Sequence, residues 1–364
     1  MTRIFLALIA CLILIYGALV LFSPKTVPPD QVISTATSTS PAATAPTVIA
    51  EQLSVPWDIA FLPDESLLVT ERTGDVLHIT GAGSTTRIRV SKATGGESGL
   101  LGIVLHPLFE QNSYIYLYIS TDTANGTTNR VVRFTYKNDT LTQSKEIIAG
   151  IPGALYHDGG RMEFGPDGML YITTGDATRS ELAQDITSLA GKILRIHDDG
   201  TIPSDNPFKN AVYSYGHRNP QGLAWDESGQ LWETEHGPTG EDGRCCHDEI
   251  NKIVKGGNYG WPTIIGDATK DGLISPQINS GDDTWAPASL TYMDGALYFG
   301  ALKGVGIYRA TIANGTAGAL TKVIDGTYGR IRSIRRGPDG MLYITTSNTD
   351  GRGKQLPDDD RIIR

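Results

Sequence analysis

A length of 364 residues allows one large domain or two of ordinary size. With 20% charged and 40% hydrophobic residues, the composition is typical of a globular chain and not of a disordered one. The net charge of −9 argues against nucleic acid as a partner. The 42 glycines and 19 prolines indicate many turns, which favours an all-β fold.

The N-terminus carries an uninterrupted, uncharged and mostly apolar run, Ile4–Phe22, directly after Arg3. The run is longer than the apolar part of most signal peptides, and no clear cleavage site follows it. We expect residues 1–22 to form an uncleaved signal anchor. A lipoprotein signal ending at Cys11 is the alternative. The anchor predicts an exported domain tethered to the outer face of the cytoplasmic membrane, with the short basic end inside.

Residues 23–47 consist mainly of serine, threonine, proline and alanine. Such a segment cannot bury a core, so it predicts an extended linker. The folded domain is therefore expected to occupy residues 48–364.

One sequence unit recurs along this domain: an alternating apolar strand, a turn similar to Pro-Asp-Gly, and a second alternating strand. The six copies are Trp57–Thr70, Leu101–Tyr118, Met162–Thr174, Leu223–Trp232, Leu290–Phe299 and Ile334–Thr346. A lone hairpin is marginal in water, so each copy must bury its faces against its neighbours. The spacing predicts a six-bladed β-propeller of four-stranded antiparallel blades. We expect Val48–Gln52 or Arg361–Arg364 to complete a shared blade.

Polar residues that the turns do not require lie beside the repeats. His157, next to two glycines, precedes the third copy and is a candidate general base. Arg218 lies in a tight turn before the fourth copy, and Lys303 follows the fifth. Arg330 and Arg332 precede the sixth copy, on one face of a strand. If these loops converge, the cations share one mouth, which predicts an anion-binding site.

The fourth copy continues into an acidic loop, residues 235–251, that contains Cys245 and Cys246. Loops rich in carboxylates and carbonyls favour calcium, because hard cations prefer oxygen ligands. A solvated acidic loop is the alternative, and the histidines and cysteines lack the spacing of a zinc site. We expect the two cysteines to be free, partly buried thiols. A vicinal disulfide and a thiol–metal contact are the alternatives.

From about Val55 to Arg364 the chain resembles the glucose/sorbosone dehydrogenase family, the soluble aldose dehydrogenases that depend on pyrroloquinoline quinone (PQQ). The matching segments lie at Gly96–Gly102, His157–Arg161, Gly216–Gly222, Glu235–Pro238, Asp248–Asn251, Gly257–Pro262, Leu302–Gly304 and Arg330–Arg332. The resemblance implies oxidation of an aldose to a lactone. His157 would remove the proton of the anomeric hydroxyl while hydride passes to the quinone, and Arg218 would stabilise the charge that develops there.

The resemblance also implies the ligands of two cofactors. Arg218, Asn219, Lys303, Arg330 and Arg332 would hold the carboxylates and quinone oxygens of PQQ. The carbonyls of Gly237 and Pro238 would hold Ca²⁺, and Glu249 and the Tyr259 carbonyl match a second, structural calcium site.

The chain departs from the family in two places. Glu97 stands where the family often has glutamine beside the cofactor, and a carboxylate there requires compensation by calcium or by a proton. Residues 243–247 form an apparent insertion in the metal-binding loop.

Two other functions fit a propeller with such a loop: a calcium-dependent hydrolase of the lactonase type, and a non-catalytic binding module. The hydrolase would need acidic side chains that point down the channel from several blades. The partners of a dehydrogenase would be an aldose sugar and an external electron acceptor, either a quinone or a cytochrome.

Overall fold

The computed structural model describes residues 45–364, apart from 82, 92–94, 125 and 241–242. The predicted anchor and nearly all of the linker lie outside this range. The propeller forms a compact unit that begins at Pro46. Within the described ranges, no helix has the length and apolarity needed to cross a membrane.

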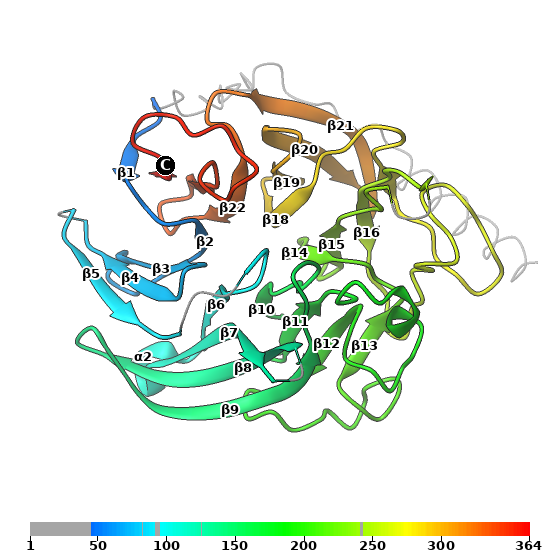
Figure 1. Ribbon diagram of the computed structural model, residues 1–364, viewed down its shortest axis with the longest axis horizontal. Helices are drawn as coiled ribbons and strands as arrows, with labels where there is room; N and C mark the ends of the chain where they lie inside the picture. Colours follow the sequence, from blue (N-terminus) through cyan, green and yellow to red (C-terminus); the bar gives the residue numbers. More distant parts are fainter. Residues whose placement is uncertain (1–44, 82, 92–94, 125, 241–242) are drawn as a thin grey trace, which may run out of the picture. The chain divides into compact units, whose positions relative to one another are not determined.

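The described residues form six antiparallel sheets of four strands each (Figure 1). Blade 1 contains β2 (Pro56–Phe61), β3 (Leu67–Glu71), β4 (Asp75–Ile79) and β5 (Thr85–Arg89). Blade 2 contains β6 (Leu100–Leu105), β7 (Tyr114–Thr123), β8 (Gly126–Lys137) and β9 (Thr140–Pro152). Blade 3 contains β10 (Met162–Phe164), β11 (Leu170–Thr174), β12 (Lys192–Ile196) and β13 (Val212–Tyr215).

Blade 4 contains β14 (Pro220–Trp225), β15 (Leu231–Glu235), β16 (Glu249–Lys252) and β17 (Ile278–Asn279). Blade 5 contains β18 (Pro287–Met293), β19 (Ala296–Ala301), β20 (Gly306–Ala313) and β21 (Thr316–Asp325). Blade 6 contains β22 (Ile331–Arg336), β23 (Leu342–Thr346), β24 (Ile362–Ile363) and β1 (Val48–Ala50). Two short helices of the described part of the chain, α2 (Phe109–Asn112) and η1 (Ser180–Ala183), lie in the loops.

The first strand of each blade contacts the first strand of the next blade, and β22 contacts β2 to complete the circle. Each of the six sequence copies supplies the first two strands of one blade. The turn glycines Gly168 and Gly340 have φ of +74° and +78°, a backbone conformation that glycine adopts without steric cost. The predicted six-bladed propeller is therefore confirmed.

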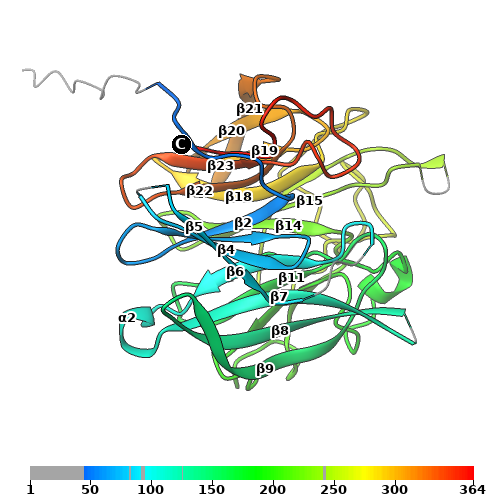
Figure 2. The same cartoon turned by 60° about the vertical axis from the view of Figure 1, so that its left-hand side comes forward.

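Both ends of the propeller meet in blade 6. Strand β1 pairs with β24, with Val48 opposite Ile363, and Thr47 and Arg364 exchange two backbone hydrogen bonds of 2.9 and 2.8 Å. The two segments lie side by side in both views (Figures 1 and 2). Both segments that we expected to complete a shared blade therefore take part in it.

Apolar side chains fill the spaces between blades. In the largest cluster, Tyr116 and Tyr118 of blade 2 pack with Met162 and Ile172 of blade 3, and all four are fully buried. Because each blade covers the face of the next, the ring has no sheet face left open to water at these junctions.

The innermost strands also bury charge. Asp58 of β2 is fully buried and forms ion pairs with Arg161 Nη1 at 2.5 Å and with Arg335 Nη2 at 2.8 Å. Arg335 also pairs with Glu163 of β10, and Arg161 lies over the Trp57 ring at 4.3 Å. Burial raises the pKa of Asp58, but attraction to Arg161 and Arg335 outweighs it and lowers the pKa overall. This network links three blades across the channel.

Closure of blade 6 predicts a loss of stability when β1 is removed. The free energy of unfolding of a chain that starts at Gln52 should be about 2 kcal/mol lower than that of a chain that starts at Pro46, because the shorter chain loses the β1 hydrogen bonds. Urea unfolding of the two truncated proteins checks this, and equal midpoints would contradict it.

Asp58→Asn should cost about 3–5 kcal/mol, because it leaves the buried Arg161 without its charge partner. Since the folded-state pKa of Asp58 lies below its unfolded value of 3.8, the pair stabilises the fold above that pH. Its contribution is lost as the pH falls through the folded-state pKa. Unfolding measured between pH 2 and 7 should therefore show a shallower acid dependence in Asp58→Asn than in the unsubstituted protein.

Candidate active site

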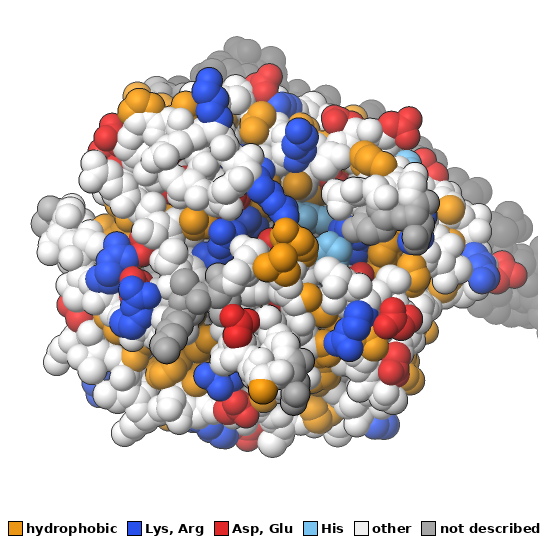
Figure 3. Space-filling view, in the orientation of Figure 1, with side chains coloured by type: hydrophobic (Ala, Val, Ile, Leu, Met, Phe, Trp, Pro, Cys, Tyr) orange, Lys and Arg blue, Asp and Glu red, His pale blue; other side chains and the backbone are white. Residues whose placement is uncertain are grey.

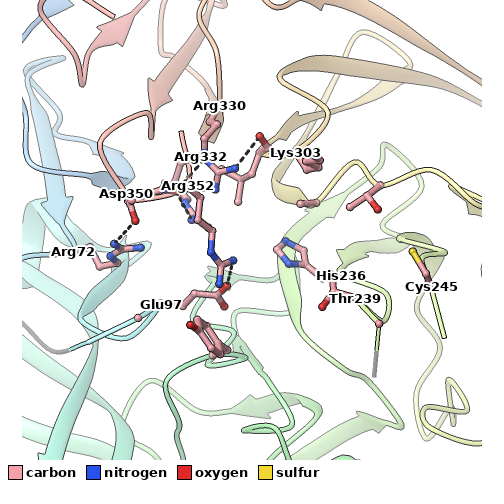
Figure 4. Close-up of a pocket in the computed structure, with 17 residues that line it drawn as sticks. Arg72, Glu97, His236, Thr239, Cys245, Lys303, Arg330, Arg332, Asp350 and Arg352 are labelled. Atoms are coloured by element: carbon pink, nitrogen blue, oxygen red, sulfur yellow. Dashed lines mark hydrogen bonds and ion pairs between the residues drawn. The ribbon is translucent and has the colours of Figure 1, made fainter. Parts of the chain in front are cut away.

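A hollow near the centre of one face gathers lysine, arginine and histidine side chains (Figure 3). Its larger part is a cavity of about 680 Å³, which we call the cationic chamber. The charged side chains that line this chamber are Arg72, Lys303, Arg330, Arg332, Arg352, Glu97 and Asp350 (Figure 4). Five cations against two carboxylates make it a site for an anion.

A second cavity of about 540 Å³ adjoins the first, and we call it the histidine chamber because His157 lines it. Arg218, Asp176 and Trp261 also belong to its wall. Five residues line both cavities: Glu97, Tyr156, His236, Thr239 and Arg352. The two chambers therefore lie side by side, with these five residues at their boundary.

Asp350 holds the cations of the cationic chamber together. Its Oδ2 accepts from Arg330 Nε at 3.1 Å and Nη2 at 2.8 Å, and lies 3.9 Å from Arg332 Nη2. Arg332 also donates to Gln221 Oε1 at 2.8 Å, and Arg72 reaches the Asp350 carbonyl at 3.5 Å. Burial lowers the pKa of Arg332 to about 9, so the side chain stays charged at neutral pH.

His157 is held in a fixed orientation. Its Nδ1 lies 2.8 Å from Asp176 Oδ1, and the other carboxylate oxygen accepts from Trp261 Nε1 at 2.8 Å. The Thr178 backbone N–H also donates to Asp176 Oδ1 at 2.8 Å. A carboxylate surrounded by such donors accepts from His157, so Nδ1 carries hydrogen and Nε2 is the basic atom. His157 has a φ of +65°, in the left-handed region that residues with a side chain seldom adopt.

Arg218 and Asn219 follow one another at the start of β14. Arg218 donates from Nη1 to the His236 carbonyl and from Nη2 to Thr239 Oγ1, each at 3.3 Å. Asn219 accepts from the Gly159 N–H at 3.1 Å, which ties it to the His157 loop. Within the described residues, the buried Asn219 Nδ2 and His236 Nε2 have no hydrogen-bond partner. Burial lowers the pKa of His236 to about 3, so its ring is neutral.

Glu97 lies at the boundary between the two chambers. Its Oε2 accepts from the His157 N–H at 3.2 Å, and its Oε1 pairs with Arg352 Nη1 at 3.0 Å. Burial raises the pKa of Glu97, but attraction to the positive charges of Arg332 and Arg352 contributes to a pKa that is lowered on balance. Arg352 is thus the counter-ion of Glu97 in this structure.

The predicted metal residues gather at one place. Gly237, Pro238, Glu249 and Tyr259 all line a small cavity next to Arg218, together with the carboxylate of Glu235. The residues of both calcium sites that the resemblance implies therefore line the same small cavity.

A cluster of buried acids adjoins this cavity. Asn251 Nδ2 donates to Glu233, Glu235 and Glu249 at 3.1, 3.1 and 3.0 Å. Burial, followed by repulsion from Glu235, raises the pKa of both Glu233 and Glu249. Within the described residues, Glu233 Oε1 and Asn251 Oδ1 are buried without a partner. Several oxygen ligands that repel one another suit a hard cation.

Cys245 and Cys246 form a disulfide. The expectation of free thiols is therefore wrong. Cys245 lines the cationic chamber, and the Cys246 carbonyl packs so closely on Gly237 that a Cβ there would lie 1.8 Å from it. The apparent insertion, residues 243–247, therefore packs directly against Gly237.

The sequence predicted seven residues of the PQQ and sugar site, and the structure places them in or next to the walls of the two chambers. They are His157, Arg218, Asn219, Lys303, Arg330, Arg332 and Glu97. Sequence reasoning missed Arg72, Asp176, Asp350 and Arg352. Arg72 and Asp176 each follow the second strand of a repeat, so the same search extended to the far end of each copy would have found them.

Comparison with known proteins identifies the family. The model of the glucose/sorbosone dehydrogenase family matches residues 53–356. The chain belongs to the glucose/sorbosone dehydrogenase family. The match covers most of the described propeller and both chambers, so this is an oxidoreductase of the quinoprotein sugar dehydrogenase family.

Individual relatives support the same family assignment. The aldose sugar dehydrogenase YliI of Escherichia coli is 32% identical, over 88% of this chain and 94% of its own. The crystal structure of a Thermus thermophilus oxidoreductase, described as a glucose dehydrogenase, is 41% identical with a TM-score of 0.83. It covers 88% of this chain and 99% of its own. The PQQ-bound aldose sugar dehydrogenase of Streptomyces coelicolor is 36% identical with a TM-score of 0.80, covering 88% and 97%.

Asp176→Asn should lower kcat for sugar oxidation at least 100-fold, because an amide can present an N–H to His157 Nδ1 and so select the wrong tautomer. Dye-linked assays with PQQ and calcium check this. KM should change little, since Asp176 orients the base and leaves the rest of the wall intact. A loss confined to KM would contradict the role.

Proposed function

We propose that this protein oxidises aldose sugars to lactones with PQQ and calcium. The arrangement that carries the proposal is a carboxylate-oriented histidine beside a chamber lined by five cations, with shared walls between them. An anionic cofactor in the first chamber would lie next to a sugar at the base in the second.

The cationic chamber suits PQQ by its chemistry. Lys303, Arg330 and Arg332 offer charged donors for carboxylates, and Arg72 and Arg352 extend this set. Asn219 Nδ2 and Arg332 Nε are buried and have no hydrogen-bond partner among the described residues, so they are donors that an oxygen-rich ligand would satisfy. Asp350 now occupies the guanidinium groups of Arg330 and Arg332, so it acts as a counter-ion until ligand carboxylates compete for them.

The metal residues suit calcium. The carbonyls of Gly237 and Pro238 would hold one ion at the edge of the histidine chamber. Glu249, with the Tyr259 carbonyl, would hold a second, and this ion would also relieve the repulsion with Glu235 that raises the pKa of Glu249.

In the reaction, His157 Nε2 accepts the proton of the anomeric hydroxyl while Asp176 keeps the ring in place. When bound, PQQ would supply the oxidant for the anomeric carbon, and calcium would supply a Lewis acid. Arg218, fixed by the His236 carbonyl and Thr239, stabilises the negative charge that develops beside it. Trp261 and Tyr156 offer ring faces to the sugar and help to exclude water.

The hydrolase alternative lacks support within the described residues. Asp58 and Glu163 are the acids of the central network, and both are paired with arginine instead of being arranged as metal ligands. We also propose, on the sequence alone, that residues 1–22 tether the domain to the outer face of the cytoplasmic membrane, near a quinone or cytochrome acceptor.

A spectral titration with PQQ in the presence of calcium tests the cofactor. We expect tight uptake of one equivalent, followed by dye reduction when an aldose is added. Arg332→Met should weaken uptake about 10- to 100-fold, because it removes charge-assisted hydrogen bonds from a buried position. Arg336→Met is the matched control on the same strand, since Arg336 is half exposed and faces Asp294. Uptake that is equally weak in all three proteins would overturn the proposal.

His157→Gln separates binding from catalysis. It should keep PQQ uptake while lowering kcat by at least 100-fold, since the base is lost and the cationic chamber is untouched. Lactone hydrolysis by PQQ-free protein, with no sugar oxidation by the loaded protein, would favour the hydrolase instead.

A further inference from the structure

Glu97 and Arg352 meet at the junction of the two chambers. Glu97 comes from the loop between β5 and β6, and Arg352 comes from the loop between β23 and β24. Both line both cavities, and Figure 4 shows the Arg352 side chain extending across the opening toward Glu97, opposite His236. A ligand that spans the chambers must therefore pass this ion pair.

The pair is held in place from several sides. Glu97 Oε2 accepts from the His157 N–H, and the Arg352 N–H donates to Asp350 Oδ1 at 2.9 Å. The Arg352 guanidinium lies over the Tyr156 ring, 5.0 Å from its centroid. More than half of the Arg352 side chain, 54%, is exposed, so its remaining donors are accessible from the opening. The geometry is thus fixed while the polar atoms stay within reach of a solute.

The other charged groups of the histidine chamber each contact neighbouring protein groups. Asp176 is engaged by His157 and Trp261, and Arg218 by the His236 carbonyl and Thr239. Arg244 donates to the Pro262 carbonyl at 3.1 Å and lies over Trp261. Among the described charged residues of the histidine chamber, Glu97 and Arg352 are the two that also line the cationic chamber.

We propose that Glu97 and Arg352 are the specificity-determining pair of the sugar site, selecting neutral aldoses and rejecting aldoses that carry a carboxylate, such as uronic acids. This inference rests on the proposed dehydrogenase function and names its substrate class.

Charge complementarity is the reason. Adjacent hydroxyls of a neutral aldose can donate to the Glu97 carboxylate and accept from Arg352, with the Tyr156 ring beside them. A uronate would bring a second carboxylate toward Glu97, and Arg352 is already neutralised by that residue. With glutamine at position 97, Arg352 would lose its counter-ion and would attract the uronate instead.

The test compares galactose with galacturonate, which differ at the carbon farthest from the anomeric centre. The measured quantity is the ratio of kcat/KM for galacturonate to that for galactose, with PQQ- and calcium-loaded protein. Glu97→Gln should raise this ratio at least tenfold, and the double variant Glu97→Gln/Arg352→Gln should return it toward the original value. Lys354→Gln in the Glu97→Gln background is the matched control, because Lys354 is exposed in the same loop and lines neither chamber.

Sugar binding to cofactor-free protein, followed by ligand-observed NMR, gives a readout that needs no turnover. The same order of relative affinities is expected there. An unchanged ratio in Glu97→Gln, or a raised ratio that survives Arg352→Gln, would overturn the inference. The loaded protein could oxidise no aldose while Glu97→Gln still shifts the relative affinity toward galacturonate. In that case the proposed dehydrogenase function fails, whereas the role of Glu97 and Arg352 in sugar selection holds.

Discussion

Gathering cationic side chains at the mouth of a channel is unfavourable, and this structure depends on a few buried carboxylates to make it possible. Asp350 collects Arg330 and Arg332 above, while Asp58 holds Arg161 and Arg335 below. Glu163 also pairs with Arg335, which balances the charges around Asp58, whereas Asp350 alone is shared by Arg330 and Arg332. The cationic chamber is therefore neutralised incompletely. The remaining positive charge is what makes the cationic chamber selective for an anion. The same residues that stabilise the empty chamber also define what it can bind.

The propeller separates scaffold from chemistry. Inner strands carry the charge network that ties the blades together, whereas the functional side chains lie on loops or at strand starts, as Glu97, His157, Lys303 and Arg352 do. Each of these four residues comes from a different loop. Their mutual distances are therefore set by the packing of whole blades. This packing keeps the histidine chamber and the cationic chamber side by side, while His157 and Lys303 each stay in the wall of only one of them.

Local sequence patterns predicted much of the fold and part of the site. The repeated strand–turn–strand unit is readable because alternation and turn glycines depend on neighbours in sequence. His157, Arg218 and Arg330 stood out because each precedes such a unit. Asp176 and Arg352 did not, since their importance arises from partners 19 and 255 residues away. The disulfide was also missed, because adjacent cysteines bond or stay free according to the conformation of their loop.

The pairing of β1 with β24 joins residues more than 300 positions apart, Val48 and Ile363. Contacts of such separation are slow to form, because a long stretch of chain must be ordered before they contribute. Blade 6 cannot be assembled until the last strand has been synthesised, whereas blades 1 to 5 each consist of consecutive strands. The nascent protein must then carry an incomplete ring, in which β1 has no partner strand until β24 emerges. An unpaired strand edge can pair with another chain, so an incomplete blade 6 exposes the folding protein to aggregation.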